Sequence, residues 1–251
     1  MTHRIAIVLI VLSGLLASDP AHAERILVAV AANFTGTARQ IAAAFEQASG
    51  QDVALIPGAT GKHYAQIVNG APFDVLLAAD RERPERLERQ GRARPGSRFT
   101  YALGRLVLWS PVPGRVDPDG AVLGTGGFRH LALANPRLAP YGRAAQQTLE
   151  HLGQWQRLQG RLVFGENVGQ AFRFVESGAA ELGFVALAQV RQLGAGEDAW
   201  WTVPVSHHAP IEQQAVLLSD AAPAADFLAF LREEPARDII RAAGYGVPDV
   251  H

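Results

Sequence analysis

Short apolar runs and helical repeats alternate along most of the chain. A run such as ILVAV at 26–30 is typical of a parallel strand that is buried on both faces. Such runs predict strands at 26–30, 53–56, 73–78, 130–134, 161–164, 182–187 and 215–218. Apolar residues at helical spacing predict helices at 34–48, 64–69, 83–90, 143–152, 168–176, 224–232 and 235–243. The alternation predicts an α/β fold with mixed, mostly parallel sheets flanked by helices.

The pattern also predicts two lobes. A β-rich run at 99–109 separates two series of strands and helices, and it is long enough to pass from one lobe to the other. The segment 200–205 leads back. We therefore expect lobe 1 to comprise 24–104 and 206–251 and lobe 2 to comprise 105–205, with crossings near Gly104 and Val205. The turns that follow the strands would then surround one cleft between the lobes.

The first 23 residues have the features of a cleavable secretory signal peptide. Arg4 supplies the positive charge, 5–16 is apolar, and Ala21-His22-Ala23 forms a small-x-small cleavage site. A membrane anchor is the alternative, but this apolar run is shorter than the ~20 residues that a spanning helix needs. We expect the mature chain to begin near Glu24.

Composition narrows the functional classes. The chain has no cysteine, which excludes disulfides, zinc thiolates, thiol nucleophiles and a lipid-attachment cysteine. An exported chain of this kind points to a bacterial periplasm. The formal net charge is -1, and the cations at 81–94 alternate with acidic residues. No basic patch therefore indicates a nucleic-acid partner.

Four turns follow strands and could face the predicted cleft: 32–33, 58–61, 139–142 and 167–169. Asn33 stands at the predicted N-cap of the first helix. A helix start leaves backbone N–H groups unpaired and favours an anion. The four turns contain neutral donors and no paired carboxylate, so they predict a site for a fully deprotonated oxyanion.

Several segments of the sequence resemble the periplasmic molybdate-binding proteins of ABC transporters, especially the branch known from Azotobacter. They read AANFTGTARQIAAAFEQASG, GATGKHYAQIVNGAPFDVLLAADRERPERL, PGSRFTYALGRLVLWS, NPRLAPYG and VGQAFRFVESGAAELGFVALAQ, and the similarity runs from about Ile26 to the C-terminal AAGYGVP. The resemblance implies a type II, two-lobed periplasmic binding protein. Molybdate or tungstate would lie between the lobes, held by hydroxyl and backbone N–H groups without a counter-cation.

The resemblance also implies the site residues. Asn33 and Ala32 lie in the first turn, Thr60 in the second, Tyr141 in the third, and the backbone of Val168 in the fourth. The family often has serine or threonine in the first turn, so here Asn33 must supply its backbone or amide N–H. Thr60 stands where serine is usual. Ala186 stands where another branch has a tyrosine, so Tyr141 becomes the expected phenol donor.

The function that the resemblance implies is binding without catalysis. The chain would capture molybdate or tungstate as an oxyanion and deliver it, as a monomer, to a membrane permease, and it would need no cofactor and no bound metal cation. One alternative is a binder of sulfate, phosphate or an organic carboxylate. Another is a periplasmic hydrolase or transferase acting on a phosphorylated or sulfated substrate, but the turns offer only Thr60, His63 and Tyr141 as reactive groups. A nucleotide P-loop at 58–62 is excluded because Ile56 and His63 break its pattern.

Overall fold

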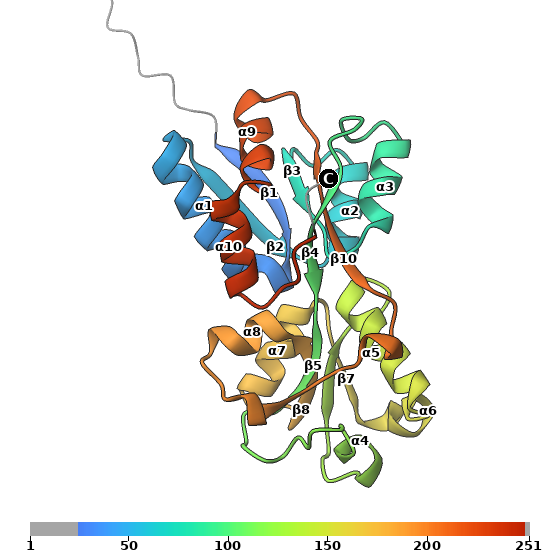
Figure 1. Ribbon diagram of the computed structural model, residues 1–251. Coiled ribbons are helices and arrows are strands. Elements are labelled where there is room, and N and C mark those ends of the chain that lie inside the picture. Colours follow the sequence, from blue (N-terminus) through green and yellow to red (C-terminus); the bar gives the residue numbers. More distant parts are fainter. Residues whose placement is uncertain (1–24, 249–251) are drawn as a thin grey trace, which may run out of the picture.

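The strands of the chain form two separate five-stranded sheets, one in each lobe (Figure 1). The computed structural model describes residues 25–248, so the predicted signal peptide lies outside the described residues. Within 25–248, no helix combines the length and the apolar character needed to cross a bilayer. The predicted fold class, α/β with two mixed sheets flanked by helices, is confirmed.

The sheet of lobe 1 has the order β2-β1-β3-β10-β4. Its strands are β1 (Ile26–Ala31), β2 (Val53–Gly58), β3 (Val75–Leu77), β4 (Phe99–Gly104) and β10 (Ile211–Leu217). β1 pairs in parallel with β2 and β3, whereas β10 is antiparallel to β3 and β4. The helices of this lobe are α1 (Thr35–Ser49), α2 (Thr60–Val68), α3 (Glu82–Arg89), α9 (Ala222–Phe230) and α10 (Glu234–Ala242).

The sheet of lobe 2 has the order β7-β6-β8-β5-β9. Its strands are β5 (Leu106–Trp109), β6 (Leu131–Ala134), β7 (Leu162–Gly165), β8 (Leu182–Ala186) and β9 (Trp200–Thr202). β6 is parallel to β7 and β8, and β5 is antiparallel to β8 and β9. Its helices are α4 (Val122–Thr125), α5 (Pro140–His151), α6 (Trp155–Leu158), α7 (Val168–Glu176) and α8 (Leu187–Gln192). Short 3-10 helices occur in both parts of the chain: η1 (Ala32–Phe34) follows β1, and η2 (Gln159–Arg161), η3 (Glu197–Ala199) and η4 (Val205–His207) come later.

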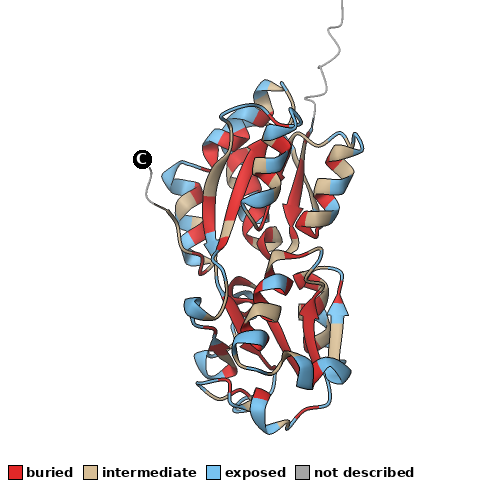
Figure 2. Ribbon diagram, turned by 90° about the vertical axis from the view of Figure 1, so that its right-hand side faces the viewer, coloured by how far each residue is buried: buried red, intermediate tan, exposed pale blue. Residues whose placement is uncertain are grey.

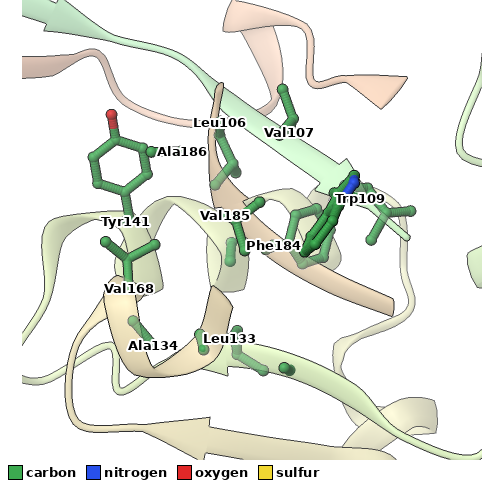
Figure 3. Packing of buried hydrophobic residues seen from close by; sticks show 14 of the residues in the cluster. Leu106, Val107, Trp109, Leu133, Ala134, Tyr141, Val168, Phe184, Val185 and Ala186 are labelled. Carbon is green, nitrogen blue, oxygen red and sulfur yellow. The ribbon is translucent and has the colours of Figure 1, made fainter. Parts of the chain in front are cut away.

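Burial on both faces of the sheets explains the apolar runs. Successive residues of a strand point to opposite faces. Val28 and Val30 belong to one cluster of buried residues, and Ala29 between them belongs to another. In Figure 2 the buried residues accordingly concentrate on the strands and on the inner sides of the helices. Lobe 2 has its own core, in which Leu106 and Phe184 are almost fully buried (Figure 3).

Two segments connect the lobes. The β-rich run at 99–109 forms β4 and β5, which lie in different sheets and are separated only by Arg105. The chain returns to lobe 1 through η4 and then β10. On this basis we propose the lobe boundaries expected from the sequence, 104/105 and 205/206.

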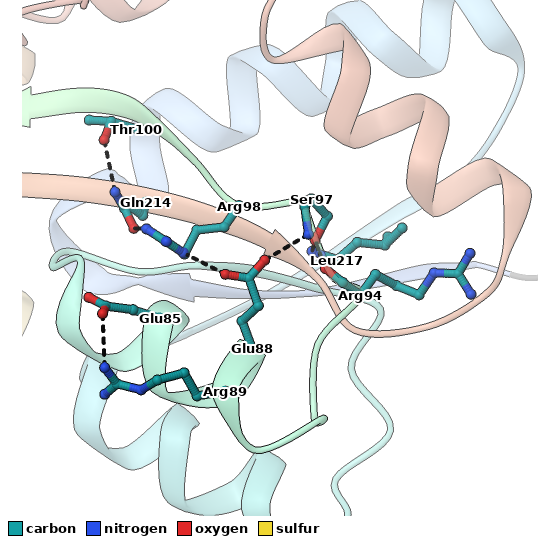
Figure 4. Close-up of polar contacts among 10 residues, drawn as sticks. Glu85, Glu88, Arg89, Arg94, Ser97, Arg98, Thr100, Gln214 and Leu217 are labelled. Atoms are coloured by element: carbon teal, nitrogen blue, oxygen red, sulfur yellow. Dashed lines mark hydrogen bonds and ion pairs between the residues drawn. The ribbon is translucent and has the colours of Figure 1, made fainter.

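Three elements begin three or four residues before their predicted starts. α2 begins at Thr60 rather than at 64. α5 begins at Pro140 rather than at 143, because proline suits the first turn of a helix. β10 begins at Ile211 rather than at 215, because its polar residues are buried in hydrogen-bonded positions. Gln214 accepts from Arg98 at 2.9 Å and donates to Thr100 at 3.0 Å, and Arg98 also pairs with Glu88 of α3 at 3.0 Å (Figure 4).

Candidate functional site

The four predicted turns meet at one small cavity between the lobes. Each lies at the carboxyl end of a parallel strand, β1, β2, β6 or β7, and leads into a helix. The cavity is small, with a volume of about 10 Å³, far below the ~300–1,000 Å³ typical of sites for drug-sized ligands. All five predicted site residues line it: Ala32, Asn33, Thr60, Tyr141 and Val168. The structure therefore brings together residues that are up to 136 positions apart, from 32 to 168.

The cavity has an uncharged lining. The other residues around it are Ala31, Gly58, Ala59, Ala79, Ala139, Pro140 and Asn167. Lysine, arginine, aspartate and glutamate are absent from the lining, as far as the described part of the chain shows. Such a lining offers no carboxylate to accept the proton of a monoprotonated anion, and its hydrogen-bond donors are neutral.

Thr60 is a buried side chain with one uncommitted proton. Its hydroxyl oxygen accepts a hydrogen bond from the Ala79 N–H at 3.0 Å, and the residue is 1% exposed. Within residues 25–248 the Thr60 hydroxyl proton has no acceptor. Because a hydroxyl carries one donor and two acceptor sites, Thr60 can still donate to an anion in the cavity.

Tyr141 presents a second uncommitted hydroxyl. The side chain is 1% exposed, and its oxygen has no hydrogen-bond partner in the described residues. The phenol projects away from α5 (Figure 3). A methyl group placed on Gly104, at the crossing, would collide with the Tyr141 oxygen. Burial, with a smaller contribution from Tyr245 and Tyr101, raises the pKa of Tyr141 well above its ordinary value. The phenol is therefore protonated at neutral pH and available as a donor.

The prediction that Asn33 caps the first helix is wrong. Asn33 lies inside η1, and α1 follows with Phe34 at its N-cap position. The Asn33 amide nitrogen instead donates to Gln213 Oε1 at 2.6 Å and to Tyr245 Oη at 3.2 Å, and Tyr245 donates to the Asn33 carbonyl at 2.8 Å. Two buried polar partners thus hold the amide away from the helix start. Both amide protons are committed, which leaves the backbone N–H of Asn33 as its donor toward the cavity.

Gln213 and Tyr245 are functional candidates that the sequence analysis missed. Gln213 is fully buried on β10, and its Nε2 has no hydrogen-bond partner among the described residues. Both residues fix the first turn from elements 180 and 212 positions away in the chain. The only signal in the sequence is the polar pair Gln213-Gln214 beside an apolar run.

Val168 begins α7 at the fourth turn. Asn167 caps this helix, since its side chain accepts from the Gln170 N–H at 3.0 Å. The N–H groups of the first helical residues, Val168 and Gly169, have no acceptor within the helix, because the carbonyls four residues earlier lie outside it. The α7 start therefore directs neutral donors and its positive dipole end toward the cavity region.

Contacts across the cleft hold the lobes together beside the cavity. The Gly61 N–H of α2 donates to the Leu138 carbonyl of lobe 2 at 2.9 Å. Lys62, the only lysine, forms an ion pair of 2.8 Å with Glu166, so it is a contact between the lobes rather than a plain surface lysine. Arg143 pairs with Glu82 at 3.0 Å. The described structure is thus a closed form.

Comparisons with known proteins agree with this geometry. The family described as bacterial extracellular solute-binding protein matches residues 26–246. The molybdate-binding protein ModA of Azotobacter vinelandii is 49% identical over 239 residues and 94% of each chain, and ModA of Rhodobacter capsulatus is 45% identical over 229 residues and 90% of each. The solved Azotobacter vinelandii periplasmic molybdate-binding protein superimposes with a TM-score of 0.86 at 47% identity, covering 89% of this chain and all of that one. The chain therefore belongs to the family of bacterial extracellular solute-binding proteins.

Proposed function

We propose that this chain captures molybdate, and also tungstate, between its lobes and presents the closed form to the membrane permease of an ABC transporter. The observation that carries the proposal is the small uncharged cavity, into which two buried residues with uncommitted hydroxyl protons face. The high identity to molybdate-binding relatives supports the same ligand.

Binding follows from the geometry of the two lobes. Asn33 and Thr60 belong to lobe 1, whereas Tyr141 and Val168 belong to lobe 2. An oxyanion with four oxygens can accept from both sets of donors only when the lobes are closed. The ligand consequently binds the closed state more tightly than the open state and shifts the population toward it.

Selectivity would arise from size and protonation state. Molybdate and tungstate are tetrahedral dianions of nearly equal size, and both are larger than sulfate. Monoprotonated phosphate would bring an O–H donor into a cavity lined by donors, which leaves that proton without an acceptor. We expect sulfate and phosphate to bind weakly for these two different reasons.

The hydrolase alternative is less well supported. His63 is the nearest candidate base, but its imidazole packs behind the second turn, with Nε2 3.2 Å from the Val30 carbonyl oxygen and Nδ1 3.2 Å from Gln66 Oε1. His63 does not line the cavity.

We also propose that residues 1–23 are removed during export to the periplasm and that the mature protein is a monomer.

Calorimetric titration and thermal melting of the mature protein test the proposal. A ligand at ~1000 times its Kd adds about 4 kcal/mol to the free energy of unfolding. We expect one molybdate or tungstate per chain and a clear rise in Tm, with no comparable rise for sulfate or phosphate. Equal shifts with sulfate would leave a general oxyanion binder, and the absence of any shift with molybdate would contradict the proposal.

A further inference from the structure

A solvent-open cleft adjoins the inner cavity on the side of α1, α7 and α8. It has a volume of about 560 Å³ and shares Ala32, Asn33 and Asn167 with the lining of the cavity. In Figure 1, α1 of lobe 1 lies on the same side of the molecule as α7 and α8 of lobe 2. The cleft and the inner cavity therefore adjoin each other.

Two arginines line the cleft, one from each lobe. Arg39 lies on α1 and Arg173 on α7, and both are exposed. Neither forms an ion pair or a side-chain hydrogen bond with any residue in 25–248. Glu176 is the one other charged residue of the lining, so two guanidinium groups face a single carboxylate.

Both arginines lie in the second turn of their helices. Arg39 follows Thr35, the first residue of α1, by four positions, and Arg173 follows Gly169, the second residue of α7, by four. Side chains four residues apart share a helix face and lean toward the N-terminus. A Cβ on Gly169 would lie 3.8 Å from Arg173 Nη1. The Arg173 guanidinium therefore reaches the helix start beside the inner cavity. The lean of helical side chains toward the N-terminus likewise directs Arg39 toward the start of α1.

On the opposite side of the molecule, the cations that join the two lobes are paired. They lie on α2, α3 and α5: Lys62 pairs with Glu166, Arg143 with Glu82, and Arg83 with Asp80. Arg86 of α3 forms no ion pair among the described residues and lies over the Tyr64 ring. Each pair largely cancels its own field at a distance. Among the residues that line the cavity or the cleft, Arg39 and Arg173 are the cations, and both lie on the α1–α7 side.

We propose that Arg39 and Arg173 form an outer capture site, which attracts the oxyanion to the cleft mouth before the neutral inner donors bind it. The proposal rests on the proposed function, because it takes the ligand to be a dianion. Cations at the mouth raise the local concentration of the anion and its rate of association. They do not line the inner cavity, so the final site keeps its neutral donors and its selectivity.

Stopped-flow kinetics test this proposal. All four tryptophans lie in lobe 2, at 109, 155, 200 and 201, and the chain has no cysteine. An Ala48→Cys variant can therefore carry a single energy-transfer acceptor at the exposed end of α1 in lobe 1, and energy transfer then reports the closure that accompanies molybdate binding.

The variants to be compared in this labelled protein are Arg39→Gln, Arg173→Gln and the double variant. Arg115→Gln is the matched control, because Arg115 also forms no ion pair among the described residues and lies in the β5–α4 loop at the far end of lobe 2.

We expect the association rate constant of the double variant to fall at least about threefold at ~10 mM ionic strength, where charges are weakly screened. At ~300 mM the rates should converge, and the control should match the parent throughout. An unchanged association rate at low salt would overturn the capture site, and so would an equal loss in the control or a change in the dissociation rate alone.

A calorimetric titration of the same proteins separates the two proposals. Normal stoichiometry and affinity in the parent, together with an unaltered association rate in the double variant, would contradict the capture site and leave the proposed function intact. A parent protein that binds no molybdate would overturn the proposed function and the capture site with it.

Discussion

Thr60 uses its side-chain oxygen both for the fold and for the candidate site. The oxygen accepts from the Ala79 N–H, and its proton is uncommitted within the described residues. In Thr60→Val the buried Ala79 N–H loses its acceptor, which costs about 1–3 kcal/mol of stability. The anion also loses a donor, and a hydrogen bond to a charged group is worth about 1.5–3 kcal/mol, so the Kd for molybdate should rise roughly ten- to hundredfold. Thr60→Ser should retain both properties in melting and calorimetry, and a valine variant with parental affinity would exclude Thr60 from the site.

Tyr141 should show the opposite combination of effects. Its hydroxyl has no partner in the described structure, so Tyr141→Phe removes no hydrogen bond from the ligand-free protein, and Tm should not fall. The Kd for molybdate should rise about tenfold or more. Tyr101→Phe is the matched control, because the Tyr101 hydroxyl donates to the Ala78 carbonyl at 3.1 Å, and its loss should lower Tm with little effect on affinity. Parental affinity in Tyr141→Phe would assign the phenol a packing role only.

His63 makes stability depend on pH. Burial lowers the pKa of His63 below its usual 6.5, and its imidazole packs against Gly58 in the second turn. The folded state then binds fewer protons than the unfolded state, so the free energy of unfolding falls as the pH drops from 6.5 through the lowered pKa. Urea unfolding between pH 8 and 5 should show a weaker pH dependence in His63→Gln, with the contribution of His207, whose pKa is also lowered, still present. Parallel curves for the two proteins would contradict this.

At the scale of elements, the start of α2 controls how closely the lobes approach. A Cβ on Gly61 would lie 2.9 Å from the Leu138 carbonyl oxygen across the cleft. Gly61→Ala should favour α2 itself but obstruct closure, and overpacking of about 1–3 kcal/mol would raise the Kd roughly five- to hundredfold. Gly160→Ala has no atom near its new methyl group and should bind as the parent does. Equal affinities of both variants in calorimetry would show that closure tolerates the methyl.

Elements whose pattern is local were predictable from the sequence, whereas those shaped by distant partners were not. β1 and β6 are apolar throughout because both faces are buried, so their sequences suffice. The first half of β10 contains Glu212, Gln213 and Gln214, and only its neighbours reveal why polar side chains belong in that strand. The predicted turns converge on one cavity for the same local reason, since each follows a parallel strand. The partners of Asn33 lie on β10 and after α10, and no local pattern indicates them.

For the whole molecule, the exposed ion pair between the lobes contributes little to the closed form. The Lys62–Glu166 pair is about half exposed on both sides, and such pairs contribute about 0–1 kcal/mol. We expect the ligand to supply the remaining stabilisation of the closed form. Energy transfer from the lobe 2 tryptophans to an acceptor at Ala48→Cys should change on addition of molybdate and tungstate, and not on addition of sulfate. A signal that is insensitive to molybdate, in a protein that calorimetry shows to bind it, would indicate a permanently closed molecule.

The insertion of β10 between β3 and β4 determines when each half of the protein can fold. Lobe 2 is one continuous stretch of chain, but the sheet of lobe 1 needs a strand made more than 100 residues after β4, from 104 to 211. A nascent chain that has not yet reached residue 217 therefore cannot complete its first sheet. The first sheet of the chain is therefore completed only when synthesis of the polypeptide is nearly finished.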